Sequence, residues 1–348
     1  MTLHNNATTD ENSISKIIEL AKKSEEYFIF IINGGIGKNI AATAVVKGIH
    51  KKYPNKKIVI VTGWTEVWQN NPLVHRFYRA GGMLPYFYSD YIKDHPNTIP
   101  FAEEPYAKAD YILKKKHLIN IWFEMLDIPY EGETPELYFN QREVQFVENQ
   151  FVKGANNIMI IQTNGGAENN MQKISWMRDM PLDLAQAMVD NFLGEYLIYH
   201  IRRPDQPELQ NVTAVNLPIR QLFILIAFSK KRLLIDSFSQ HAAAALKLPS
   251  TVIWVRNAPE VLGYDMHDNI VTPVQDNIDT LFASYLEPYD IMGQIDQCPF
   301  PMGTALFNFD EVLKSLNKQK NNIELPASET LTPEHPPVNL SVANENPN

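Results

Sequence analysis

The sequence predicts an α/β protein built from two doubly wound, Rossmann-like domains that face each other across a cleft. Two observations carry this prediction. Short apolar runs alternate with helical stretches along both halves of the chain, which is typical of parallel sheets with helices on their faces. Each half also opens with a buried strand that leads directly into a glycine turn, at Tyr27–Ile32 and again at Ile158–Gln162.

The length and composition of the chain agree with two domains. It has 348 residues, 45% of them apolar and 20% charged, and a domain typically takes about 100–200 residues. We assign residues 14–153 to an N-terminal domain and residues 154–318 to a C-terminal domain. Residues 1–13 and 319–348 are polar, the latter also rich in proline, and we expect both to be disordered.

Charge and cysteine content limit the functional classes. With 31 Lys and Arg against 40 Asp and Glu, the net charge is −9, which disfavours a general binder of nucleic-acid phosphates but allows local basic patches. The single cysteine, Cys298, excludes internal disulfides and fits a reducing compartment. The longest apolar runs are too short to cross a bilayer, and the polar start does not look like a signal peptide. These features predict a cytoplasmic protein.

In the first half, apolar spacing and turn residues define the expected elements. Residues 65–99 are rich in aromatic and turn residues, and Lys114-Lys115-Lys116 reads as a solvated helix face. The expected helices are Ile14–Lys23, Ile40–Lys52, Lys108–Leu126 and Gln141–Gln150, and the expected strands are Tyr27–Ile32, Lys57–Thr62 and Asn97–Ala102.

The second half repeats the same scheme up to Asn257, after which the pattern loosens. The expected strands are Ile158–Gln162, Glu195–Ile201, Val212–Val215, Leu233–Ile235 and Thr251–Val255. The expected helices are Pro181–Asn191, Gln221–Phe228, Ala242–Leu246, Leu281–Leu286 and Phe309–Leu316.

The stretch from Leu233 to Trp254 carries the clearest functional signal. A buried strand ends in the polar turn Asp236–His241, and a helix and a second strand follow, which makes a βαβ unit. Hydroxyls and backbone N–H groups at a helix N-terminus suit a phosphate. The alternative is an ordinary capped helix.

The first glycine turn, Asn33–Asn39, is less specific. Glycines allow left-handed backbone angles and let a ligand approach the main chain. The spacing fits neither the dinucleotide fingerprint nor the phosphate-binding P-loop.

Three motifs follow one another along the chain. The first is Gly34-Gly35-Ile36-Gly37-Lys38, whose helix ends at Tyr53-Pro54; the second is Asn164-Gly165-Gly166 followed by Lys173-Ile174-Ser175-Trp176; the third runs from Asp236-Ser237 through His241 to Pro249. Together they resemble the G-G-I-G-D, K-x-W and D-[ST]-x-x-x-H-x-A-A-A-L-x-x-P motifs of the heptosyltransferase-like GT-B glycosyltransferases. The match covers residues 27 to about 256. The chain is also similar to glycosyltransferases carried by bacteriophages.

The resemblance implies a metal-independent transferase that needs no cofactor and uses a nucleotide sugar as donor, moving a hexosyl or pentosyl group. Lys173 would offset the negative charge of the leaving diphosphate, or it is a surface lysine. Arg202 would touch the nucleotide or form an interdomain salt bridge, and His241 has the alternative of a core imidazole. The implied donor-binding residues are Gly35, Gly37, Asn164, Gly165, Lys173, Arg202, Asp236, Ser237, Ser239, Gln240 and His241.

One departure from the family concerns the catalytic base. The acidic residue that follows the family's first glycine turn is Lys38 here, and a cationic lysine cannot accept the proton of an acceptor hydroxyl. We expect Glu103 or Glu104, at the carboxyl end of the strand Asn97–Ala102, to take this role, with Asp90 and His95 next. Lys38 would then hold a phosphate of the donor or the acceptor.

The resemblance leaves the acceptor open. A sugar hydroxyl of lipopolysaccharide or another glycan and a hydroxymethylated or hydroxylated pyrimidine in phage DNA rank equally. A DNA acceptor would bind to a local basic surface formed by lysines of the N-terminal domain, at positions 38, 47, 51, 52, 56 and 57. A catalytically inactive nucleotide-sugar-binding protein on the same fold is the alternative, and an epimerase is a third possibility.

Overall fold

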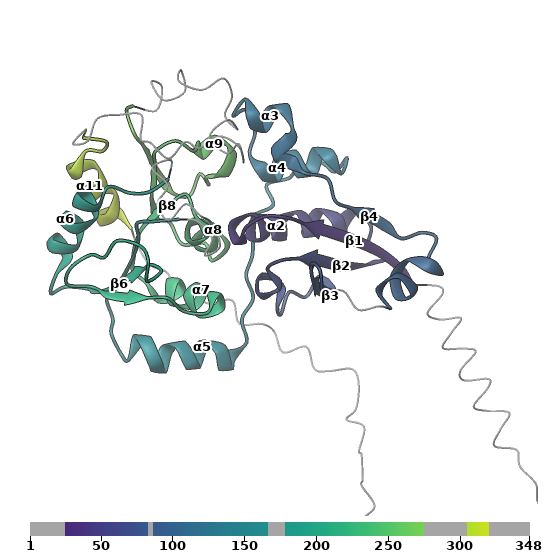
Figure 1. Cartoon of the computed structure of the whole chain (residues 1–348), viewed down its shortest axis with the longest axis horizontal. Helices are drawn as coiled ribbons and strands as arrows, with labels where there is room; N and C mark the ends of the chain where they lie inside the picture. Colours follow the sequence, from purple (N-terminus) through teal and green to yellow (C-terminus); the bar gives the residue numbers. More distant parts are fainter. Residues whose placement is uncertain (1–24, 83–85, 166–177, 275–304, 320–348) are drawn as a thin grey trace, which may run out of the picture.

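The structure, a computed structural model, describes residues 25–82, 86–165, 178–274 and 305–319 (Figure 1). The expected helices at Ile14–Lys23 and Leu281–Leu286 lie outside these ranges, as do the two termini expected to be disordered. The described chain forms two sheets, and every pairing between their strands is parallel. The predicted α/β class with two doubly wound halves is confirmed.

The first sheet has four strands in the order β3-β2-β1-β4. Phe28 lies opposite Ile58, and the register continues to Ile32 opposite Thr62, so both central strands end at the same edge. The strands are β1 (Glu26–Ile32), β2 (Lys56–Thr62), β3 (Val74–Arg79) and β4 (Ile99–Phe101). The helical elements are α2 (Ile36–Lys52), η1 (Thr65–Trp68), η2 (Ser89–Lys93), η3 (Pro105–Ala107), α3 (Ala109–Ile112) and α4 (Leu118–Met125).

The second sheet has six strands in the order β10-β9-β8-β5-β6-β7. Its order reverses at β5, where the chain runs outward first to β6 and β7 and then back through β8. The strands are β5 (Ile158–Gln162), β6 (Leu197–Ile201), β7 (Thr213–Val215), β8 (Lys231–Ile235), β9 (Thr251–Trp254) and β10 (Asp268–Val271). The helices are α6 (Leu182–Phe192), α7 (Ile219–Phe228), α8 (Phe238–Ala245), α9 (Pro259–Leu262) and α11 (Phe309–Lys318).

Alternating side chains of each strand divide the core between the two faces of each sheet. In the second sheet, Ile158 and Ile160 face α7 and α8, whereas Met159 and Ile161 pack with residues of α6 and α11. In the first sheet, Phe28 and its neighbours face α2 and α4, and one continuous buried cluster joins this layer to α7 and α8 of the second half. The two halves are therefore packed against each other, with α2 beside α8 (Figure 1).

Arg220 of α7 forms hydrogen bonds with the first half and with the segment that joins the two halves. Its guanidinium donates to both carboxylate oxygens of Glu143, to the carbonyl of Tyr138 at 2.8 Å and to the carbonyl of Glu66 at 2.8 Å. Glu143 belongs to α5 (Gln141–Val147), which continues into η4 (Glu148–Val152) and packs on α7 (Figure 1). Both α5 and η4, which precede residue 153, therefore pack on α7 of the second half.

Several elements differ from the sequence prediction. Helix α8 begins at Phe238 rather than at Ala242, so the predicted turn Asp236–His241 is helical from Phe238 onward. The edge strand β3 and the short strand β10 were not predicted, because both mix polar residues into their apolar pattern. The helix predicted at Lys108–Leu126 is two helices. Lys114 adopts a left-handed φ of 54° between them, and the ring of His117 caps the second helix by accepting from Ile119 N–H.

Candidate active site

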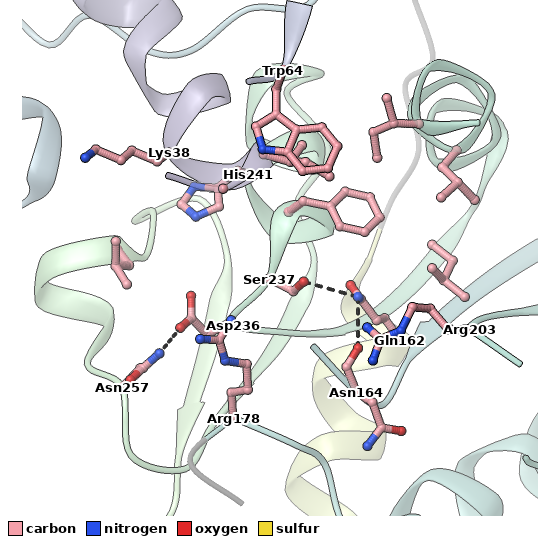
Figure 2. Close-up of a pocket in the computed structure, with 18 of the residues that line it drawn as sticks. Lys38, Trp64, Gln162, Asn164, Arg178, Arg203, Asp236, Ser237, His241 and Asn257 are labelled. Carbon is pink, nitrogen blue, oxygen red and sulfur yellow. Dashed lines mark hydrogen bonds between the residues drawn. The ribbon is translucent and has the colours of Figure 1, made fainter. Parts of the chain in front are cut away.

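A cavity of about 630 Å³ lies between the two halves, at the carboxyl ends of their strands (Figure 2). Ligand sites in open α/β sheets lie at this edge, where the strand order reverses. The first half contributes the turn after β1 together with Trp64, Tyr106 and Tyr111. The second half contributes the turns after β5, β6 and β8 and the apolar side chains of Leu217 and Leu222.

Two helix N-termini meet at this cavity. Helix α2 begins after Gly35, which has no side chain to cap it, and helix α8 begins after Ser237, whose hydroxyl makes no hydrogen bond to the helix. The first N–H groups of an α-helix have no partner within the helix, and the helix dipole adds a partial positive charge there. The pair of termini is therefore suited to an anion.

The turn after β8 is held by a side chain from β5. Gln162 donates from Nε2 to the Asn164 carbonyl at 3.1 Å and to Ser237 Oγ at 3.2 Å (Figure 2). Its Oε1 accepts from the Ser239 hydroxyl. Gln162 is only 4% exposed. The sequence prediction missed this residue, because an amide at a strand end carries no motif by itself.

Asp236 is the one carboxylate among the described residues that line the cavity. It accepts a hydrogen bond from the Asn257 amide (Figure 2). Burial raises the pKa of Asp236, while the Arg178 guanidinium and the Asn257 hydrogen bond oppose the shift. The sequence prediction also missed Arg178; its side chain lies over Gly165, where an added Cβ would meet Arg178 Cδ at 2.5 Å.

His241 lies at the contact between the two halves. Its Nδ1 is 2.8 Å from the hydroxyl of Tyr264, and its Nε2 is 3.1 Å from Gln240 Nε2, which also donates to the Leu262 carbonyl at 2.9 Å. Burial lowers the pKa of His241 to about 3, so the ring is neutral near pH 7. Both ring nitrogens are engaged within the protein, which is the arrangement of a satisfied core imidazole.

The first half meets this ring through a glycine. A Cβ built on Gly37 would lie 2.5 Å from Cδ2 of His241, closer than two carbon atoms can approach without a shift. Gly37 is therefore required for the packing of α2 against α8. The adjacent Gly35 has open space at the corresponding position.

Lys38, which lines the cavity, forms an ion pair with Glu104, which is not among the residues that line it. Lys38 Nζ donates to both carboxylate oxygens of Glu104 at 2.6 Å and lies 4.5 Å from the ring centroid of Tyr106. The lysine is 5% exposed. Burial lowers the pKa of its ammonium, and the Glu104 carboxylate opposes that shift. Lys38 thus stands at the position where the resemblance implies an acidic residue, and it is paired with the carboxylate of Glu104.

The other base candidates lie elsewhere. Glu103 is exposed and pairs with Lys108. Asp90 lies in η2, on the face of the first sheet opposite α2, because its neighbour Tyr91 packs with Tyr27. His95 Nδ1 bonds the carbonyl of Glu25, before the start of β1 and so far from the strand's carboxyl end. The structure places none of the three at the cavity.

The predicted donor-binding residues fall into three groups. Ser239 and Gln240 are fully buried and act within the protein, and Gly165 supports Arg178. Lys173 lies outside the described residues. The members that line the cavity are Gly35, Gly37, Asn164, Arg202, Asp236, Ser237 and His241.

Arg202 lines the cavity but does not form the interdomain salt bridge that was one of its two predicted roles. Its guanidinium donates to the carbonyls of Gln206, at 2.6 Å, and Pro204, at 3.2 Å, so it shapes the loop after β6. Its contact with Glu208, at 3.9 Å, lies within that same loop rather than between the halves.

The lysines expected to form a basic surface on the first half are all paired with carboxylates. These ion pairs join lysines of α2 and β2 to the segments that flank them, and together they neutralise the predicted patch. The pairs are Lys38–Glu104, Lys47–Glu136, Lys51–Glu131, Lys51–Glu133, Lys52–Asp127, Lys56–Glu26 and Lys57–Glu25.

Among the residues that the structure describes, no cluster of three or more His, Cys, Asp or Glu side chains has the arrangement of a metal site. No helix in the described ranges has both the length and the apolar character needed to cross a bilayer.

The two facing sheets and the cavity between their carboxyl edges define the GT-B architecture of glycosyltransferases. Among solved structures, the chain is similar to the Escherichia coli ADP-heptose lipopolysaccharide heptosyltransferase II, with a TM-score of 0.52 and 15% identity over 70% of this chain and 89% of that one. It is similar to the family 9 glycosyl transferase from Veillonella parvula, with a TM-score of 0.57 and 12% identity over 84% of this chain and 96% of that one.

A third similar structure is the dodecameric iron-containing heptosyltransferase TibC in complex with ADP-D-β-D-heptose, with a TM-score of 0.52 and 11% identity over 84% of this chain and 76% of that one. At these identities the likeness establishes the fold. No protein-family model matches the chain, and no curated protein matches it by sequence.

Proposed function

We propose that this protein is a glycosyltransferase that moves a sugar from a nucleotide-sugar donor to the hydroxyl of a glycan. The observation that carries the proposal is the uncapped start of α8, which faces a cavity of about 630 Å³ beside the start of α2. Pockets that bind small molecules and cofactors typically have volumes of about 300–1,000 Å³, and the cavity falls within this range.

The donor's diphosphate would lie at the turn Asp236–Ser237, on the N–H groups of α8. Arg178 and Arg203, which both line the cavity, would offset the negative charge that grows on the leaving diphosphate. Asp236 would bond a hydroxyl of the transferred sugar. Lys173 remains a prediction from the sequence.

The catalytic base in this proposal is Glu104. The acceptor oxygen attacks the anomeric carbon, the bond from that carbon to the diphosphate oxygen breaks, and the bonding pair leaves with the nucleoside diphosphate. The proton of the acceptor hydroxyl passes to the carboxylate of Glu104, the ion-pair partner of the cavity residue Lys38. This assignment places the base next to Lys38, which stands where the resemblance implies an acidic residue.

A glycan acceptor is favoured over DNA by the charges of the first half. Binding to a nucleic-acid backbone relies on lysines and arginines that neutralise phosphates, but the six lysines at which DNA binding was expected are already paired. The cavity wall of the first half instead presents Trp64, Tyr106 and Tyr111, and such rings suit the apolar face of a sugar.

Mass spectrometry of products tests the proposal. The purified protein is mixed with a panel of nucleotide sugars and with glycan or hydroxymethylated DNA acceptors. We expect a glycosylated glycan and an equal amount of nucleoside diphosphate. A glycosylated DNA product would overturn the acceptor assignment, and thermal stabilisation by donors without turnover on any acceptor would favour the inactive binding protein.

A further inference from the structure

Gln162 is the last residue of β5, the strand at which the order of the second sheet reverses. Its side chain spans the gap to β8's end, where it contacts Ser237 in the turn and Ser239 in the first turn of α8. Both serines belong to the motif expected to bind the donor, but Gln162 belongs to none of the motifs.

The hydrogen bonds determine how this amide is oriented. A backbone carbonyl only accepts, so the atom that faces the Asn164 carbonyl at 3.1 Å must be the amide nitrogen. The same nitrogen faces Ser237 Oγ at 3.2 Å and therefore donates to it. The amide oxygen, on the other side, accepts from Ser239.

The orientation of Gln162 determines the orientation of the Ser237 hydroxyl. A serine hydroxyl has one proton to donate, and Ser237 Oγ already accepts from Gln162 while making no capping bond to α8. Ser237 lines the cavity. Its proton is thus left to point into the cavity, where an oxygen of an anionic ligand would accept it.

We propose that Gln162 is a positioning residue, which turns the Ser237 hydroxyl into a hydrogen-bond donor for the donor's diphosphate. The inference rests on the proposed function, since that function puts a diphosphate at this turn. Gln162 acts through Ser237 and needs no contact with the ligand itself.

The variant Gln162→Glu reverses the direction of this hydrogen bond with little change in shape. A carboxylate accepts only, so the Ser237 proton would turn to residue 162 and away from the ligand, and a negative charge would stand beside the diphosphate. Loss of a hydrogen bond to a charged group should lower the affinity at least about tenfold. Gln186→Glu in α6 is the matched control, because Gln186 bonds Asp190 and does not line the cavity.

The assay is calorimetric titration of the full chain with UDP, GDP, ADP and CDP, together with thermal unfolding without ligand. Support requires that the wild type binds at least one of them, that Gln162→Glu weakens its binding at least about tenfold, and that Gln186→Glu stays within about twofold. Equal binding by wild type and a folded Gln162→Glu would overturn the inference and leave the proposed function intact. No binding by the wild type to any of the four would remove the proposed function instead.

A double-mutant cycle decides the matter if Gln162→Glu fails to fold. Gln162→Met keeps the length of the side chain without its hydrogen bonds, and Ser237→Ala removes the hydroxyl. If Gln162 acts through Ser237, the methionine weakens binding in the wild type but has little further effect in the Ser237→Ala background. Fully additive losses would show that Gln162 has only a structural role, and would overturn the inference.

Discussion

Acidification from pH 7 to pH 5 is expected to destabilise this fold strongly, because four of its histidines are buried and neutral. Burial is the main cause in each case, and it lowers the pKa of His117, His200 and His267 to about 4 and that of His241 to about 3. His117, His241 and His267 surround the ring of Tyr264, so three of the four sit in one cluster.

The sign and size follow from the difference between folded and unfolded states. An unfolded histidine titrates near pH 6.5. Between pH 6.5 and the folded pKa, the unfolded chain therefore binds more protons than the folded chain, and the fold loses stability as the pH falls through this window. At about 1.36 kcal/mol per pH unit, each loses about 2 kcal/mol by pH 5, or about 8 kcal/mol for four. The total stability of a domain is about 5–15 kcal/mol.

Partial burial also lowers the pKa of His75, which adds to the effect in this window. Other groups act outside the window or against it. The pKa of Glu143 is lowered by Arg220 although burial opposes the shift, so its contribution is lost only at more acidic pH. The raised pKa of Asp236 works in the opposite direction, because the folded carboxyl binds a proton more readily than the unfolded one.

Urea denaturation followed by tryptophan fluorescence at pH 7, 6 and 5 measures the effect. The slope of unfolding free energy against pH should correspond to uptake of about three to four protons between pH 6 and 5. The variant His267→Gln should reduce this slope by about one proton. An uptake below about one proton in the wild type would refute the burial argument.

Two substitution pairs test the site. Gly37→Ala should cost about 1–3 kcal/mol of unfolding free energy in denaturation experiments, because its Cβ overlaps His241, whereas Gly35→Ala has open space and should change stability by less than about 0.5 kcal/mol; equal costs would contradict the close approach of α2 to α8. Glu104→Gln should lower the transfer rate by about 10²-fold or more in a steady-state assay, with Glu103→Gln near wild type; an unchanged rate for Glu104→Gln would remove it as the base.

Much of the fold is predictable from sequence because its central strands are apolar and short and end at turn residues. The predicted strand Tyr27–Ile32 differs from β1 by one residue, and Ile158–Gln162 matches β5. The edge strand β3 escaped prediction because one side of an edge strand is solvated, so residues such as His75 and Arg76 interrupt the pattern.

The candidate site was predictable only where one short segment carries it. The Asp236–Ser237 turn lies at the cavity as its local sequence suggests. The ion pair of Lys38 with Glu104 joins residues 66 positions apart, and nothing in either local sequence selects the partner. Both Glu103 and Glu104 were candidates, and only the three-dimensional path after β4 separates them.

The guanidinium of Arg220 has a consequence for how the protein unfolds. Its side chain forms hydrogen bonds with Glu66, Tyr138 and Glu143. The connection between the halves is therefore held in one conformation. Neither half can melt without exposing the buried layer that it shares with the other. Calorimetry should therefore record a single cooperative transition, with Arg220→Ala splitting or broadening it.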